Sequence, residues 1–134
     1  MELGSKPMRY FHIRIEELEG TPAQAWADMK KTANCLADKL LELARQEAAR
    51  VKETCGQDVS KFDLAFAEGE VEIDLTWGCV SVRTPVHGGA HFPINPDRHW
   101  YLRASDLRAM IELMARTVQH PGMVRDAVER SLDD

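Results

Sequence analysis

The chain has 134 residues, a formal net charge of −5 and an apolar content of 44%. This length fits a single domain, residues 1–134, that can bury a core without disulfides or a metal. The acidic balance, with a pI near 5.5, removes long-range attraction for phosphate backbones and anionic lipids, so nucleic acid is not an expected partner.

The cysteine pattern and the hydropathy indicate a soluble protein of the cytoplasm. Three cysteines without a CxxC motif are an odd set for a disulfide framework, so we expect reduced thiols. No apolar run is long enough to span a bilayer, and no signal peptide is visible. We expect residues 1–7, which are polar and precede Met8, to be a flexible extension or the trace of an upstream start, outside the folded domain.

The first two predicted elements are a strand and a long helix. Apolar and polar residues alternate over 9–16, which is typical of a half-buried strand. Thr21 and Pro22 then form a helix start, and helical spacing of apolar residues continues toward Val51, with Gly56 as the stop. A helix of about thirty residues is ~45 Å long, more than a small domain covers, so we expect one end to project, bend or meet another subunit.

A hairpin is the clearest β pattern in the chain. Residues 61–66 and 70–77 alternate around a turn at Glu68-Gly69. The apolar face consists of Phe62, Leu64 and Phe66 before the turn and of Val71, Ile73, Leu75 and Trp77 after it. The parity changes after Trp77, and Val80 becomes the next apolar position. This shift predicts a bulge or tight turn at residues 77–79.

The last third of the chain predicts a loop followed by helices. Residues 84–98 hold three prolines and two glycines and are predicted as loop, with 99–103 as a short closing strand. Ser105 is the predicted cap of a helix, and residues 120–122 interrupt it before a final short helix. The predicted fold is α+β: an antiparallel sheet of three to five strands with one long N-terminal helix and two C-terminal helices packed on one face.

The 83–103 segment is the predicted site for a small anionic, nucleotide-like ligand. Its arginines can pair with an anion, its aromatic rings can stack on a base, and Gly88-Gly89 permits close backbone approach. The candidate ligand-binding residues are Arg83, His87, His91, Arg98, Trp100, Tyr101 and Arg103. In an alternative interpretation His87, His91 and His99 hold a transition metal and the protein is a metal-assisted hydrolase.

The leading hypothesis is a small non-enzymatic regulatory protein that binds another protein and forms a homo-oligomer. Two surfaces support it: the acidic hairpin face and the apolar helix stripe. The residues proposed as partner contacts are Glu70, Glu72, Asp74, Leu40 and Leu43. The same acidic face is also typical of the solvated side of a sheet, and the stripe can instead lie on the chain's own sheet. No catalytic motif appears, so no catalytic residue and no cofactor are predicted.

Overall fold

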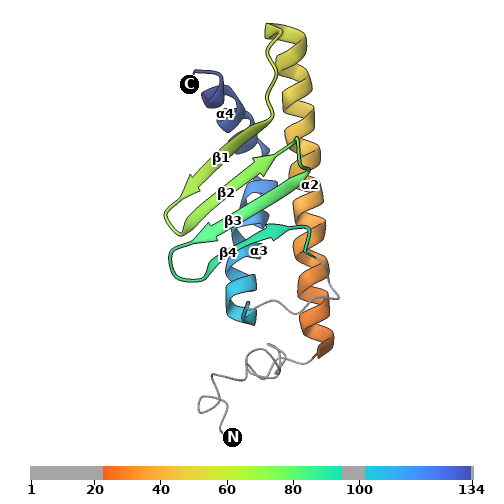
Figure 1. Cartoon of the computed structure of the whole chain (residues 1–134), viewed down its shortest axis with the longest axis vertical. Coiled ribbons are helices and arrows are strands. Elements are labelled where there is room, and N and C mark those ends of the chain that lie inside the picture. The colour runs from red at the N-terminus through yellow and green to blue at the C-terminus, as the bar shows by residue number, and fades with distance from the viewer. Residues whose placement is uncertain (1–22, 95–101, 134) are drawn as a thin grey trace, which may run out of the picture.

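A computed structural model describes residues 23–94 and 102–133 of the chain. The elements in chain order are α2 (Ala23–Cys55), β1 (Lys61–Phe66), β2 (Gly69–Asp74), β3 (Cys79–Thr84), β4 (Gly88–Phe92), α3 (Ala104–Gln119) and α4 (Pro121–Ser131). The strands form one antiparallel sheet in the order β1-β2-β3-β4, and the helices lie on one of its faces (Figure 1). The predicted fold class is confirmed. The predictions for residues 1–7 and for a strand at 9–16 lie outside the described residues.

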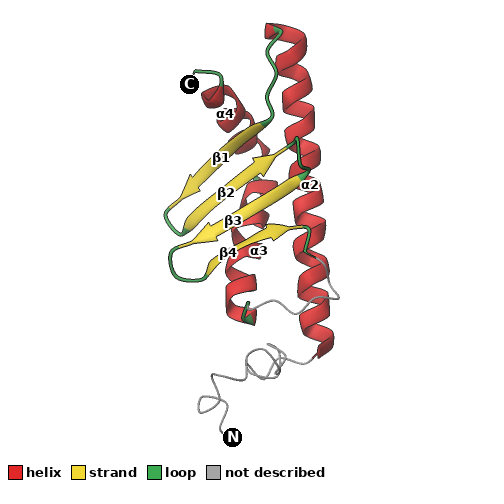
Figure 2. Ribbon diagram, viewed as in Figure 1, coloured by secondary structure: helices red, strands yellow, loops and turns green. Residues whose placement is uncertain are grey.

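One face of the long helix α2 packs against the rest of the fold along most of the helix. It is described from Ala23, directly after the predicted start, and the Gly56 N–H closes it by donating to the Lys52 carbonyl at 3.0 Å. Both ends extend beyond the strands (Figure 2). The C-terminal end nevertheless has a cover, because α4 packs against α2 and Val51 is buried.

The apolar stripe of α2 is therefore largely covered by the chain itself and is not open to a partner. Leu40 is completely buried, and Leu43 is half-buried against the same core. This burial corrects the choice of Leu40 as a partner contact, whereas Leu43, which keeps some exposure, stays a prediction. The physical reason is that α3 and α4 supply apolar surface in addition to the sheet: α3 is the main neighbour of α2.

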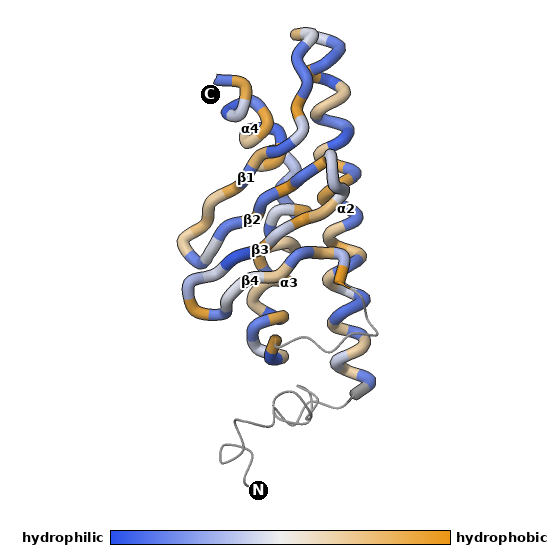
Figure 3. The backbone as a smooth tube through the Cα atoms, in the orientation of Figure 1, coloured by the Kyte–Doolittle hydropathy of each residue, from blue (hydrophilic) through white to orange (hydrophobic). Residues whose placement is uncertain are grey.

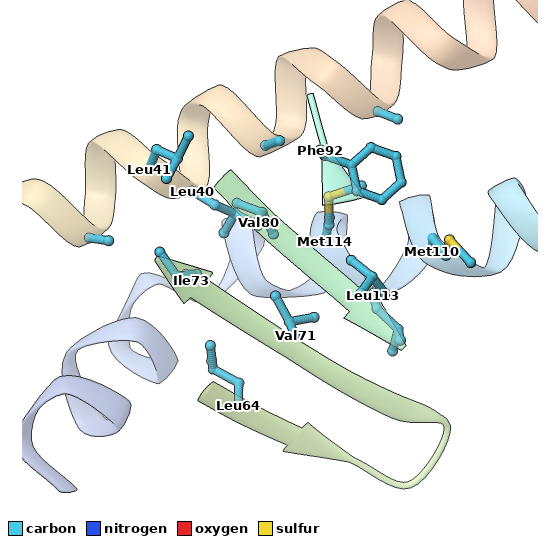
Figure 4. Close-up of a cluster of buried hydrophobic side chains, with 14 of the residues drawn as sticks. Leu40, Leu41, Leu64, Val71, Ile73, Val80, Phe92, Met110, Leu113 and Met114 are labelled. Carbon is cyan, nitrogen blue, oxygen red and sulfur yellow. The ribbon is translucent and has the colours of Figure 1, made fainter. Parts of the chain in front are cut away.

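The core lies between the inner face of the sheet and the three helices. Along β2 every second residue is buried in this layer, and Figure 3 shows the hydropathy of the chain along the same strand. Leu64, Val71 and Val82 are direct neighbours across three strands, and all are buried. Figure 4 shows strand side chains meeting Leu40 from α2 and Met114 from α3.

The turn between β2 and β3 confirms one prediction and corrects another. A tight turn follows Asp74, and Gly78 adopts the left-handed φ of +65° that such a turn uses. Strand β2 ends at Asp74, however, and Trp77 is 82% exposed rather than part of the inner face. The backbone N–H of Trp77 donates to the Asp74 carboxylate at 3.0 Å, which turns the chain before the alternation can continue.

The predicted loop at 84–98 is wrong in its first half, because residues 88–92 form strand β4. Thr84 organises the turn: its hydroxyl accepts the His87 N–H at 2.7 Å and donates to the Gly88 carbonyl at 3.3 Å. Gly88 has a φ of +74°, so the glycine pair supplies turn chemistry and then enters the sheet. Residues 95–98 lie outside the described part of the chain.

The start of α3 is also corrected. The helix begins at Ala104, and its first turn is capped by Asp106, whose carboxylate accepts the Arg103 N–H at 3.0 Å, rather than by Ser105. Residues 102–103 are not in a strand, and the rest of the predicted closing strand at 99–101 is not described. The predicted break after α3 is confirmed, since α4 starts at Pro121.

Candidate binding face of the sheet

The face of the sheet turned away from the helices carries a group of polar and charged side chains from all four strands. We call it the outer face. Because side chains alternate along a strand, its members follow from the register. They are Lys61, Asp63, Ala65, Glu70, Glu72, Asp74, Cys79, Ser81, Arg83, Gly89 and His91. No helix of the described residues covers this face, and all three lie behind the sheet in Figure 2.

Pairing between strands arranges these residues in rows. One row runs across all four strands and contains Asp63, Glu72, Ser81 and His91. The neighbouring row places Glu70 next to Arg83. Residues that are far apart in the sequence thus meet on one surface, as cross-strand neighbours ~5 Å apart.

Ion pairs balance only part of the negative charge on the outer face. Arg83 Nη2 lies 3.0 Å from Glu70 Oε1, and Lys61 Nζ lies 3.7 Å from Glu72 Oε2. Asp63 and Asp74 add two further carboxylates, so the four acidic groups exceed the two cations of this face. These pairs are solvent-exposed and contribute little stability, about 0–1 kcal/mol each. Their arrangement is therefore free to serve recognition.

A shallow hollow of about 510 Å³ lies within the outer face. Its wall includes Lys61, Glu72, Arg83 and His91. The floor is low because of Gly89, where a Cβ atom would come within 2.8 Å of Arg83 Cγ. The hollow therefore exists because two adjacent strands carry small residues, Ser81 and Gly89, between long charged ones.

A hydrogen bond between Ser81 and His91 crosses this hollow. Ser81 Oγ lies 2.5 Å from His91 Nδ1, and Ser81 is buried whereas His91 is exposed. An activated serine needs a base that a third group orients, and no carboxylate of the described residues bonds to His91. The pair is suited to holding a polar group rather than to acyl transfer.

Cys79 lies at the edge of the outer face and is not activated as a nucleophile. Partial burial raises the pKa of its thiol, and the carboxylates of Asp74 and Glu72 raise it further. The reactive species is the thiolate, so these carboxylates keep the sulfur in its unreactive form.

The predicted ligand-binding residues divide between two places. Arg83 and His91 line the hollow together. His87 lies in the turn between β3 and β4, and its Nδ1 is 2.8 Å from Asp106 Oδ1 in α3, while the same carboxylate accepts the Arg103 N–H. The structure thus brings Arg83 and His91 together and places His87 with Arg103, while Arg98, Trp100 and Tyr101 lie outside the described residues, so the full 83–103 site stays a prediction.

The structure does not bring together the two described histidines of the alternative metal site. His87 bonds to Asp106 and His91 bonds to Ser81, on different elements. His99 lies outside the described residues, and among those described no group of three or more His, Cys, Asp or Glu side chains is placed to hold an ion.

The predicted acidic contacts are brought together, and sequence reasoning missed their neighbours. Glu70, Glu72 and Asp74 follow one another along the outer face of β2. Lys61 and Ser81 were not singled out, because a single exposed lysine or serine has no pattern until strand pairing places it beside the acidic residues.

A second hollow, of about 320 Å³, lies at the end of the sheet that bears the β1–β2 and β3–β4 turns. Its apolar part comes from Pro85, Val86 and Leu113, and Val86 is 83% exposed. An ion pair between Arg116 Nη2 and Glu68 Oε2 at 3.1 Å closes one side, and the hydrogen bond from Arg116 lowers the pKa of Glu68.

No protein-family model, curated protein or solved structure matches this chain. Among the described residues, no helix combines the length and the apolar character needed to cross a membrane.

Proposed function

We propose that this protein is a non-enzymatic binding protein that docks another protein on the outer face of its sheet. The observation that carries the proposal is the one-sided arrangement of the fold. All described helices cover one face of the sheet, and the other face presents charged and hydrogen-bonding side chains to solvent. An adaptor, inhibitor or regulator works in this way, by occupying the complementary surface of its partner.

The charge of the outer face favours a partner with a basic surface. Two of its four carboxylates, those of Glu70 and Glu72, lie next to a cation. Asp63 and Asp74 form no ion pair with the other described residues, although Asp74 also accepts the Trp77 N–H. The same excess of negative charge would repel a second copy docked face to face, so we propose a different protein as the occupant. Self-association stays a prediction, now without the α2 stripe as its interface.

The outer face alone is too small for a protein–protein interface of standard size. Four strands ~4.8 Å apart and ~20 Å long present about 400 Å². A standard interface buries about 800 Å² on each partner. The partner must therefore also contact the turns at the ends of the sheet, which carry the exposed side chains of Trp77 and Val86.

A matched pair of alanines tests the proposal. Ala65 lies on the outer face and Ala49 on the solvent side of α2, and both are exposed. A photo-crosslinking amino acid at Ala65, introduced in cells that make the protein, should yield a discrete protein adduct, whereas Ala49 should yield none. The combined Glu70→Gln and Glu72→Gln variant should weaken the adduct. An adduct at Ala49 alone, or none at either position, would contradict the proposal.

A second proposal is that a small anionic ligand occupies the hollow. It is supported by Arg83, Lys61 and His91 lining the same concavity. Nucleotides and phosphorylated metabolites should then raise the melting temperature, and Arg83→Ala should abolish the shift. The ion pairs of Arg83 and Lys61 with glutamates weigh against this ligand, because an anion has to displace a carboxylate. The idea fails if a broad panel gives no shift.

A further inference from the structure

Trp77 is the most conspicuous exposed side chain next to the outer face. Among the described residues, it and Val86 are the large apolar side chains that solvent reaches almost fully, at 82% and 83% exposure. Tryptophan is usually buried in large part, and at interfaces it is among the residues that contribute most to affinity. An exposed tryptophan beside an uncovered sheet face is therefore a candidate anchor.

The turn holds Trp77 on a defined backbone. The Asp74 carboxylate accepts its N–H at 3.0 Å, and Gly78 turns the chain with a φ of +65°. The Leu75 N–H donates to the Ser60 carbonyl at 2.7 Å, which ties the turn to the start of β1. A side chain on a fixed backbone loses less entropy when it binds, so this turn is pre-organised for contact.

The outward side chains of β2 set a repeat that a partner can match. Glu70, Glu72 and Asp74 are alternate residues of one strand, ~6.7 Å apart. A segment in extended conformation repeats its side chains at the same distance. Trp77 follows three residues after the last of the three, in the turn that ends β2, and the face of its ring attracts a lysine or arginine cation.

We infer that the partner lays an extended segment with basic residues at alternate positions along β2, and that its last basic side chain packs on Trp77. The inference rests on the proposed function and specifies its partner. It is carried by the uncovered sheet face, the exposure of Trp77 and the complementarity of charge and spacing.

The experiment uses two labelled synthetic peptides of equal composition, measured by fluorescence anisotropy with the full chain. One alternates lysine and serine, and the other groups its lysines in a block. The alternating peptide should bind more tightly. Trp77→Ala should weaken it about two- to fivefold, the loss expected for an exposed cation–π contact, and Trp77→Phe should restore part of the affinity. Asp38→Asn, which removes an exposed carboxylate of α2 away from the outer face, should leave the affinity unchanged.

Two outcomes would overturn the inference. Equal binding of the two peptides would remove the spacing argument, and equal binding by wild type and Trp77→Ala would remove the anchor.

Asp74→Asn keeps the acceptor for the Trp77 N–H but removes a charge, so it should weaken binding of the alternating peptide without altering the turn. If neither peptide binds while Ala65 still crosslinks to a partner, the basic segment is wrong and the docking face stands. If Ala65 also gives no adduct, both fail.

Discussion

The two faces of the sheet come from the same four strands, but different interactions determine which residues each face carries. On the inner face, Val71 and Ile73 are completely buried, and their identity follows from packing. On the outer face, the alternating neighbours Glu70 and Glu72 are ion-paired and partly exposed, and packing does not determine them. One strand can thus hold the core together with one set of side chains and leave the alternate set on a solvent-exposed face that packing does not constrain.

The strongest test of this division compares adjacent residues of β2. Ile73→Ala removes a fully buried side chain and should lower the free energy of unfolding by about 2–5 kcal/mol. Glu72→Gln alters an exposed ion pair and should change it by less than about 0.5 kcal/mol. Urea denaturation followed by circular dichroism measures both. Similar losses in the two variants would show that the outer face is structural.

Two glycines provide the next comparison. A Cβ at Gly69 would collide with the backbone oxygen of Arg83 and press on Leu113, so Gly69→Ala should cost about 1–3 kcal/mol. A Cβ at Gly89 would come within 2.8 Å of Arg83 Cγ and 3.1 Å of the Val82 backbone oxygen, a milder conflict than at Gly69, so Gly89→Ala should cost less than Gly69→Ala. Thermal unfolding of the two variants gives the order, and the reverse order would contradict the assignment of the faces.

The smallest expected effect is a difference in thiol reactivity. Cys35 and Cys55 are exposed, whereas burial and the nearby Asp74 and Glu72 raise the pKa of Cys79. A raised pKa leaves less thiolate at neutral pH, so iodoacetamide should label Cys79 last. Raising the pH should accelerate its labelling, and Glu72→Gln should do the same by removing a negative charge. Peptide mass spectrometry at timed intervals follows all three sites, and early labelling of Cys79 would contradict the acidic environment.

Most of the fold was predictable because its patterns are local. Alternation identified the inward residues of β1 and β2, and helical spacing identified α2, α3 and α4. Strand β4 was not predicted because the pair Gly88-Gly89 is typical of a turn. Residues 88–92 become a strand only through pairing with β3. Trp77 was misplaced because the alternation continues in the sequence beyond the residue where Asp74 turns the chain.

The candidate site was predictable only in part. The carboxylates of β2 repeat every second residue, and that repeat is visible in the sequence. The meeting of Ser81 with His91 depends on the register of β3 with β4, and the separation of His87 from His91 depends on which element each side chain reaches. Such long-range placement has no signature in a single chain.

Carboxyl footprinting of the protein, alone and with the captured partner bound, tests the central claim most directly. Labelling with a carbodiimide and an amine, read by mass spectrometry, reports each carboxylate separately. If a partner docks on the outer face, Glu70, Glu72 and Asp74 should become protected while Asp38, Glu42 and Glu53, exposed on α2, keep their labelling rates. Protection of the helix carboxylates with an unchanged outer face would contradict it.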